Sequence, residues 1–480
     1  MQFKKQFNTI LAIVSLTISI ISCKKDFLDG QDQTGVLLRE DYVVDLKTTN
    51  EYLNGAYADL ATKVFLGYRS IYPELIADNI KPILGSSGSA SMLNFYKWSQ
   101  SADNLNVDLS TAANANSISY DCYKQIRYAN FIIESSEKYK NENLVQAKII
   151  KGQALALRGY SKFLLLNIFC QPYNFTSDAS HPGIVLFSSW DPLEQKLSRS
   201  SVKESYQSII DDLQSAIDIL DAGSFDRLAF SRLSAMALLS RVYLYSNDFT
   251  KAKDYAVAVI KEVPLMGIGY PDKLFTPEST ESLLELPPAG FANGYVTQFA
   301  SFFFRGRREF NATSDIANLL TEDVNDKRGS WVTQSDGAWQ ITKYPIGVVA
   351  GAIIPEAGYY EPIIRSSELY LTASESYFEL DKTDSAIYYL DAIRLRANAQ
   401  ALPTSSSGND LKDLIFKERR KELAFEGQRM FDLLRWKKNV IRQDVLTGGP
   451  TELVYGSKKE IAPISTIDVD GMGIQQNEGY

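Results

Sequence analysis

The sequence has few of the residues from which metal sites are built. Its 480 residues include one histidine, His181, and three cysteines. Because a metal site usually gathers several such side chains at fixed spacing, neither a metal nor a cofactor is expected. The net charge is -8 at pH 7. No nucleic-acid partner is expected either, since phosphate contacts need a basic surface.

The apolar run at the N-terminus is too short to cross a bilayer. Ile10 to Ile21 falls below the ~20 residues that a spanning helix needs. The run follows two lysines and precedes a cysteine, which is the pattern of a secretory signal. Its last residues, Ile-Ile-Ser-Cys, resemble the lipobox of bacterial lipoproteins. This resemblance implies that residues 1–22 are a signal peptide and that Cys23 carries the lipid anchor.

The sequence also lacks a Pro-, Ser- or Gly-rich linker between its periodic segments, so residues 23–480 are expected to form one domain. The other two cysteines are Cys122 and Cys170. In an antiparallel helix hairpin they would be offset by ~9 residues, or ~13 Å. A disulfide tolerates a Cα separation of only ~7 Å, so we expect two buried, unpaired thiols.

Helical periodicity dominates two ranges of the chain. Apolar residues recur every three to four positions over 45–262 and 363–440, which predicts a helical scaffold there. Residues 263–360 contain scattered prolines, glycines and short apolar segments. They are expected to form a loop-rich ligand-binding insertion with short strands, because binding residues often lie on loops held by a rigid scaffold. The predicted fold class is mainly α.

An internal repeat refines this fold. Tyr243 and Tyr377 each lie nine positions before an alanine, Ala252 and Ala386. Both segments predict helix, short turn, helix, with a small residue where the helices approach each other. This packing is typical of tetratricopeptide repeats. Because the spacing is irregular, we expect tetratricopeptide-like helical pairs in one α-superhelical body with loop-rich insertions.

A single buried helix is predicted over residues 417–436, KERRKELAFEGQRMFDLLRW. Its apolar side chains cover too wide an arc for a surface helix. Its charges are spaced for ion pairs: Arg419 with Glu422, Glu426 with Arg429, and Asp432 with Arg435. A glycosidase would need two carboxylates on opposite sides of the scissile bond. Glu418, Glu422 and Glu426 point the same way from one helix, so they are expected to brace the scaffold.

The ERRKELAFEGQRMFDLLRW stretch resembles the hallmark helix of the SusD/RagB family. IIRSSELYLTASESYFEL (363–380), VNDKRGSW (324–331) and the C-terminal Gln476-Asn477-Glu478-Gly479-Tyr480 also resemble family segments, in the family's order. Ser465 and Glu478 replace prolines, and Gly159 stands where alanine is usual. The resemblance implies a non-catalytic, surface-exposed lipoprotein of the outer membrane. It would bind a nutrient, usually a glycan, for a SusC-like TonB-dependent β-barrel transporter.

A glycan platform needs exposed aromatic rings flanked by polar side chains, because sugars present both C–H faces and hydroxyls. Aromatic residues in polar, irregular stretches are the candidates. The predicted ligand-binding residues are Asp78, Asn79, Tyr96, Trp98, Arg305, Trp331 and Trp339.

Two other functions stay open at this point. A tetratricopeptide scaffold could bind only proteins or peptides, and a secreted glycosidase is the third hypothesis. The sequence does not decide whether the ligand is a glycan or a peptide.

Overall fold

The computed structural model describes most of the chain after its first 38 residues. The described residues are 39–61, 71–85, 87–102, 118–190, 197–221, 223, 225–286, 304–305, 308–349, 352–355, 361–464 and 466–480. The predicted signal peptide and lipid-bearing Cys23 lie outside them. Within the described ranges, no helix is both long and apolar enough to span a membrane.

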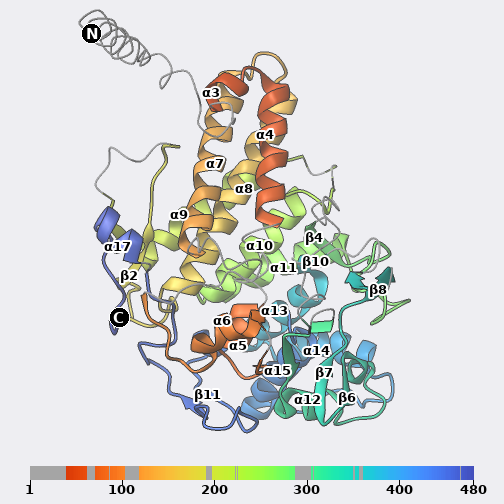
Figure 1. The fold of residues 1–480 in the computed structure, drawn as a ribbon. Helices are drawn as coiled ribbons and strands as arrows, with labels where there is room; N and C mark the ends of the chain where they lie inside the picture. Colours follow the sequence, from red (N-terminus) through yellow and green to blue (C-terminus); the bar gives the residue numbers. More distant parts are fainter. Residues whose placement is uncertain are drawn as a thin grey trace, which may run out of the picture.

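Helices that follow one another in the chain pack side by side, as the periodicity predicted (Figure 1). The N-terminal helices are α3 (Arg39–Tyr42), α4 (Leu46–Asp59), α5 (Tyr72–Leu75), α6 (Ser87–Tyr96), α7 (Ile118–Lys138), α8 (Leu144–Phe169) and α9 (Val202–Ile219). They are followed by α10 (Arg232–Tyr245), α11 (Phe249–Glu262), α12 (Ser314–Leu320), α13 (Ser366–Glu379), α14 (Thr383–Ala397), α15 (Gly408–Glu422), α16 (Arg429–Arg435) and α17 (Thr466–Met472). The mainly α fold is confirmed.

The internal repeat forms two equivalent helical pairs, α10–α11 and α13–α14. In the first, the Ser240 hydroxyl donates to the Ala252 carbonyl at 2.8 Å; in the second, Ser374 donates to Ala386 at the same distance. Both alanines are fully buried. Tyrosine rings stack in each pair, Tyr243 on Tyr255 and Tyr377 on Tyr389. The tetratricopeptide-like packing predicted from the sequence is therefore present.

Short strands occur in the irregular range 263–360, as expected, and others lie outside it. They include β4 (Ser282–Leu286), β8 (Ile346–Val349), β9 (Ala352–Pro355) and β10 (Glu361–Arg365), and a four-stranded antiparallel sheet has the order β1 (Ile80–Pro82), β5 (Phe310–Ala312), β7 (Ala338–Ile341), β6 (Val332–Ser335). The remaining strands are β2 (Pro182–Val185), β3 (Arg199–Ser201), β11 (Val440–Ile441) and β12 (Glu452–Leu453). Trp339 lies on the same face of β7 as the buried Ile341, so one side of its ring packs against the core while the side chain stays half-buried.

The prediction of one helix over residues 417–436 is wrong. Helix α15 ends at Glu422 and α16 begins at Arg429, and the turn between them contains Phe425 at φ 69° and Gly427 at φ 76°. A left-handed backbone cannot continue a right-handed helix. Gly427 was the residue in the sequence that could have indicated this break.

The cysteine prediction is confirmed, since Cys122 and Cys170 are both buried and unpaired. The predicted pairing of the hallmark charges is correct only for Asp432 with Arg435. The turn redirects the other carboxylates, so that Glu422 and Glu426 pair with Arg365.

Two glycines make a matched test of the helix packing. A Cβ on Gly152 in α8 would lie 2.6 Å from Leu220 Cγ, whereas one on Gly55 in α4 meets nothing within 4 Å. We expect Gly152→Ala to lower the free energy of unfolding by about 1–3 kcal/mol through overpacking. Gly55→Ala should raise it by about 0.5–1 kcal/mol. Urea unfolding measures both, and equal effects would contradict the close α8–α9 approach.

Candidate ligand-binding cleft

The hallmark segment is held by a buried network of ion pairs centred on Arg365. The Arg365 guanidinium lies 2.8 Å from Glu281 and from Glu422, and 2.6 Å from Glu426. Arg396 contacts Glu281 and Glu422 as well. All five side chains are buried or nearly so. These contacts join β10, α14, α15 and the segment before β4.

Lys343 extends the network into the turn after α15. Its Nζ donates to the Glu422 and Ala424 carbonyls and to the Glu426 carboxylate. Burial would raise the pKa of Glu426, but Arg365 and Lys343 lower it to about 2. A carboxylate held ionised and fully paired cannot deliver a proton at neutral pH. The Glu422–Glu426 pair therefore has the bracing role that the sequence predicted.

Asp78 and Asn79, two of the predicted ligand residues, are buried against the same hallmark segment. Asp78 accepts two hydrogen bonds from Arg429, at 2.7 and 2.8 Å, and Asn79 accepts one from Arg420 at 3.0 Å. Burial opposes the charge of Asp78, yet Arg420 and Arg429 hold its pKa well below the usual range. Both side chains are used inside the scaffold, so neither is displayed for a ligand.

Four aromatic rings were predicted to be exposed, and for three of them this prediction is wrong. Tyr96, Trp98 and Trp331 are all buried. The Arg442 guanidinium carbon lies 4.2 Å from the Tyr96 ring centroid and 4.1 Å from that of Trp98. Lys343 Nζ lies 3.9 Å from the Trp331 ring. Rings in polar sequence stretches are here covered by long cationic side chains, which a sequence pattern does not reveal.

Trp339 and Arg305 are half-buried. Arg305 donates to the Tyr344 carbonyl at 2.8 Å. Contact of these two residues with a ligand stays a prediction. The seven candidate residues lie in the ranges 78–117 and 290–345, which are described only in part, since residues 103–117 and 290–303 lie outside the described ranges.

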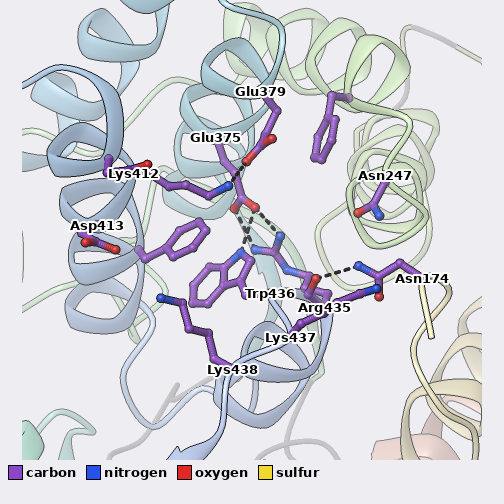
Figure 2. A pocket seen from close by; sticks show the side chains of 13 residues that line it. Asn174, Asn247, Glu375, Glu379, Lys412, Asp413, Arg435, Trp436, Lys437 and Lys438 are labelled. Atoms are coloured by element: carbon purple, nitrogen blue, oxygen red, sulfur yellow. Dashed lines mark hydrogen bonds and ion pairs between the residues drawn. The ribbon is translucent and has the colours of Figure 1, made fainter. Parts of the chain in front are cut away.

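A cleft of about 600 Å³ opens between the repeat pairs and the end of the hallmark segment (Figure 2). Its volume is within the usual range for small-ligand sites. It is lined by Asn174, Asn247, Phe249, Glu375, Glu379, Asn409, Lys412, Asp413, Phe416, Arg435, Trp436, Lys437 and Lys438. These residues come from α11, α13, α15, α16 and adjoining turns, all within the ranges 45–262 and 363–440 predicted to form the scaffold.

Trp436 forms the base of the cleft. Its ring stacks on Phe416 with centroids 3.7 Å apart, and its Nε1–H donates to Glu375 at 2.9 Å. Glu375 also accepts from the Arg435 guanidinium. Trp436 is half-buried, and Phe249 is a second half-buried ring in the lining. The rings are thus held in place while part of their surface faces the cleft.

Polar groups surround these rings. Asn247, Asn409 and Asp413 are exposed, and the described residues offer none of their side chains a hydrogen-bond partner. The Asn174 amide donates to the Arg435 carbonyl, while its Oδ1 has no partner in the described structure. Aromatic surface next to unused amides and a carboxylate suits a ligand with both apolar faces and hydroxyls. No cluster that could hold a metal ion occurs among the described residues.

Comparison with known proteins places this helical-repeat binding fold in a family. A family model described as "Starch-binding associating with outer membrane" matches residues 27–244, and one described as "SusD family" matches residues 302–477. The chain belongs to the SusD/RagB family.

Several relatives resemble the chain over most of its length. SusD-like protein P2 of Formosa agariphila is 24% identical, with 89% of this chain and 90% of the relative covered. The crystal structure of a putative sugar binding protein from Bacteroides vulgatus has 25% identity and a TM-score of 0.78, covering 92% and 99% of the two chains. A SusD superfamily protein from Bacteroides thetaiotaomicron has 25% identity and a TM-score of 0.80, covering 90% and 100%.

Removing the central guanidinium should destabilise the fold. Arg365→Met removes a guanidinium that three buried carboxylates share, so we expect the free energy of unfolding to fall by about 3–5 kcal/mol. Lys417→Met is the control, because Lys417 pairs with Glu322 at the surface. Its loss should cost less than about 1 kcal/mol. Chemical unfolding compares them, and a similar small cost for both would contradict the role of Arg365.

The network also predicts acid sensitivity. The pKa of Glu426 is about 2 in the folded state, against 4.5 ordinarily. The unfolded chain therefore binds a proton that the folded chain does not, and stability falls as pH drops from about 4.5 toward 2. Burial raises the pKa of Glu74 to about 7, but that group is protonated in both states below pH 4.5. Urea midpoints at pH 4.5 and pH 3 should differ, and Glu426→Gln should reduce the difference.

Proposed function

We propose that this protein is a lipid-anchored, surface-exposed lipoprotein of the outer membrane that captures glycans and passes them to a SusC-like TonB-dependent transporter. Cys23 is the proposed site of lipid attachment. The family description, with its association to starch and the outer membrane, supports this role. So does the likeness to a protein described as sugar binding.

The observation that carries the proposal is the composition of the cleft. Trp436 and Phe249 supply aromatic surface, and Asn247, Asn409 and Asp413 supply free hydrogen-bonding groups within one concave site. Sugars need this combination, because their C–H faces pack on rings while their hydroxyls both donate and accept hydrogen bonds. Trp339, on strand β7, and Arg305 remain proposed as further ligand contacts outside the cleft.

The two rival functions have weaker support. The repeat pairs would also suit a scaffold that binds only proteins or peptides, and the cleft between them could receive a peptide. A glycosidase requires an acid and a second carboxylate on either side of the bond. In the described structure, Glu422 and Glu426 are locked in ion pairs, so we expect no catalysis from them.

Asn409→Ala tests whether the cleft holds the sugar. Asn409 is exposed, and no described side chain bonds to it, so its loss should leave the fold intact. Removing a hydrogen bond worth about 1 kcal/mol should weaken oligosaccharide binding about fivefold. Isothermal titration against a panel of oligosaccharides and peptides measures the change.

Asn141→Ala is the matched control, because Asn141 is an exposed amide in the turn between α7 and α8, whose residues do not line the cleft. Trp339→Ala tests the alternative position on the sheet. If Trp339→Ala alone lowers the affinity, the ligand binds at the sheet and not in the cleft. Binding of peptides without any oligosaccharide would favour the scaffold function.

A further inference from the structure

The charges that line the cleft do not cancel. Lys412 Nζ lies 2.7 Å from Glu379, and Arg435 is paired with Glu375 and Asp432. These pairs account for two of the lining carboxylates and two of the lining cations. The others are Asp413 and two consecutive lysines.

Lys437 and Lys438 are the two lysines, and both are exposed at the edge of the cleft. No carboxylate of the described structure lies within ion-pair distance of either ammonium group, although the chain as a whole is acidic. Figure 2 shows them beyond the end of α16, with Asp413 on the neighbouring helix α15. The α16 side of the cleft therefore presents two unpaired positive charges.

The backbone conformation after α16 fixes the positions of these two lysines. Lys438 N–H donates to the Leu433 carbonyl and Lys437 N–H to the Leu434 carbonyl, at 2.9 and 3.0 Å. This is the hydrogen-bond pattern of a Schellman motif, and Lys437 has the left-handed conformation at φ 55°. Glycine is the residue favoured there, because a Cβ makes this conformation costly.

The equivalent positions after the first helices of the two repeat pairs use other residues. Asn247 has φ 61° and Asp381 has φ 57°, and Asn and Asp adopt this conformation more readily than most residues. A lysine at the same position is costlier to the fold than glycine, asparagine or aspartate. Conformational preference therefore does not explain a lysine at this position, and the property that distinguishes lysine from these residues is its positive charge.

A helix C-terminus attracts cations in any case, because the carbonyl ends carry partial negative charge. Lys261 in the last turn of α11 is such a residue, exposed and remote from the lining of the cleft. The effect does not account for Lys437 and Lys438 both facing a concave site with aromatic and amide groups. Replacing Lys261 therefore distinguishes an effect of the helix C-terminus from an effect of charge in the cleft.

We propose that the cleft binds an acidic oligosaccharide, one whose sugar units carry carboxylate or sulfate groups. This inference rests on the proposed glycan-binding function and names the class of glycan. Lys437 and Lys438 donate charge-assisted hydrogen bonds to anionic groups of the ligand, which are stronger than those between neutral groups. Asn247, Asn409 and Asp413 meet hydroxyls of the adjoining units. Asp413 accepts from hydroxyls and repels a second anion placed beside it.

The experiment is isothermal titration of the full chain, extracted in detergent, with three probes of equal length. These are an oligogalacturonate, a neutral malto-oligosaccharide and oligoglutamate, and a sulfated dextran oligosaccharide replaces the first in a parallel series. We expect at least one acidic sugar to bind more than tenfold tighter than the neutral one. Its affinity should fall as sodium chloride rises from 50 to 500 mM, because salt screens the charges.

Two variants and one control locate the effect. Lys437→Gly and Lys438→Ala should each weaken binding of the acidic sugar about tenfold and weaken binding of a neutral sugar by much less. Lys437→Gly should also keep or raise the melting temperature, since glycine suits φ 55°, so a loss of affinity cannot be ascribed to misfolding. Lys261→Ala removes a helix-terminal lysine outside the cleft and should leave affinity unchanged.

The other outcomes distinguish failure of this inference from failure of the proposed glycan-binding function. Equal affinity for acidic and neutral sugars, or acidic binding that both lysine variants retain, overturns this inference and leaves glycan binding standing. Oligoglutamate that binds as tightly as the acidic sugars overturns the assignment to a saccharide. Failure of every oligosaccharide to bind overturns the proposed function itself.

Discussion

The interaction on which the rest of the structure depends is the buried contact of Arg365 with Glu281, Glu422 and Glu426. It ties together parts of the chain that are distant in sequence. Because an unpaired buried charge costs several kcal/mol, the network tolerates few alternative arrangements. It thereby specifies how the second helical pair, the short strands and the hallmark segment fit together.

That constraint also shapes the cleft. Glu426 reaches Arg365 only because the chain turns sharply between α15 and α16, with Phe425 and Gly427 in the left-handed conformation. The turn brings α16 back beside α13, where Arg435 pairs with Glu375. Trp436 follows directly and stacks on Phe416 of α15. The family's hallmark sequence therefore does two things, since its first half braces the scaffold and its end forms the base of a concave site.

Several features could be predicted because they depend on residues close together in sequence. Helix pairs follow from apolar periodicity and small residues, and the repeat around Ala252 and Ala386 was visible as a pattern of letters. The unpaired cysteines followed from the rise of a helix. The expected exposure of Asp78, Asn79, Tyr96, Trp98 and Trp331 was wrong because burial depends on partners far away in the sequence. Trp98 is covered by Arg442, and Asp78 is paired with Arg429, and no local pattern links those positions.

The sequence by itself determined the family, the mainly helical class and the paired-helix packing, because local periodicity and family-specific motifs carry that information. Only the tertiary structure decided which charges pair between distant segments, where the hallmark helix breaks and which rings face solvent. Those outcomes depend on the desolvation of charged and aromatic groups, and a group's environment comes from segments that meet only in the folded chain. The cleft beside Trp436 is formed by such segments, so it could not be found from the sequence alone.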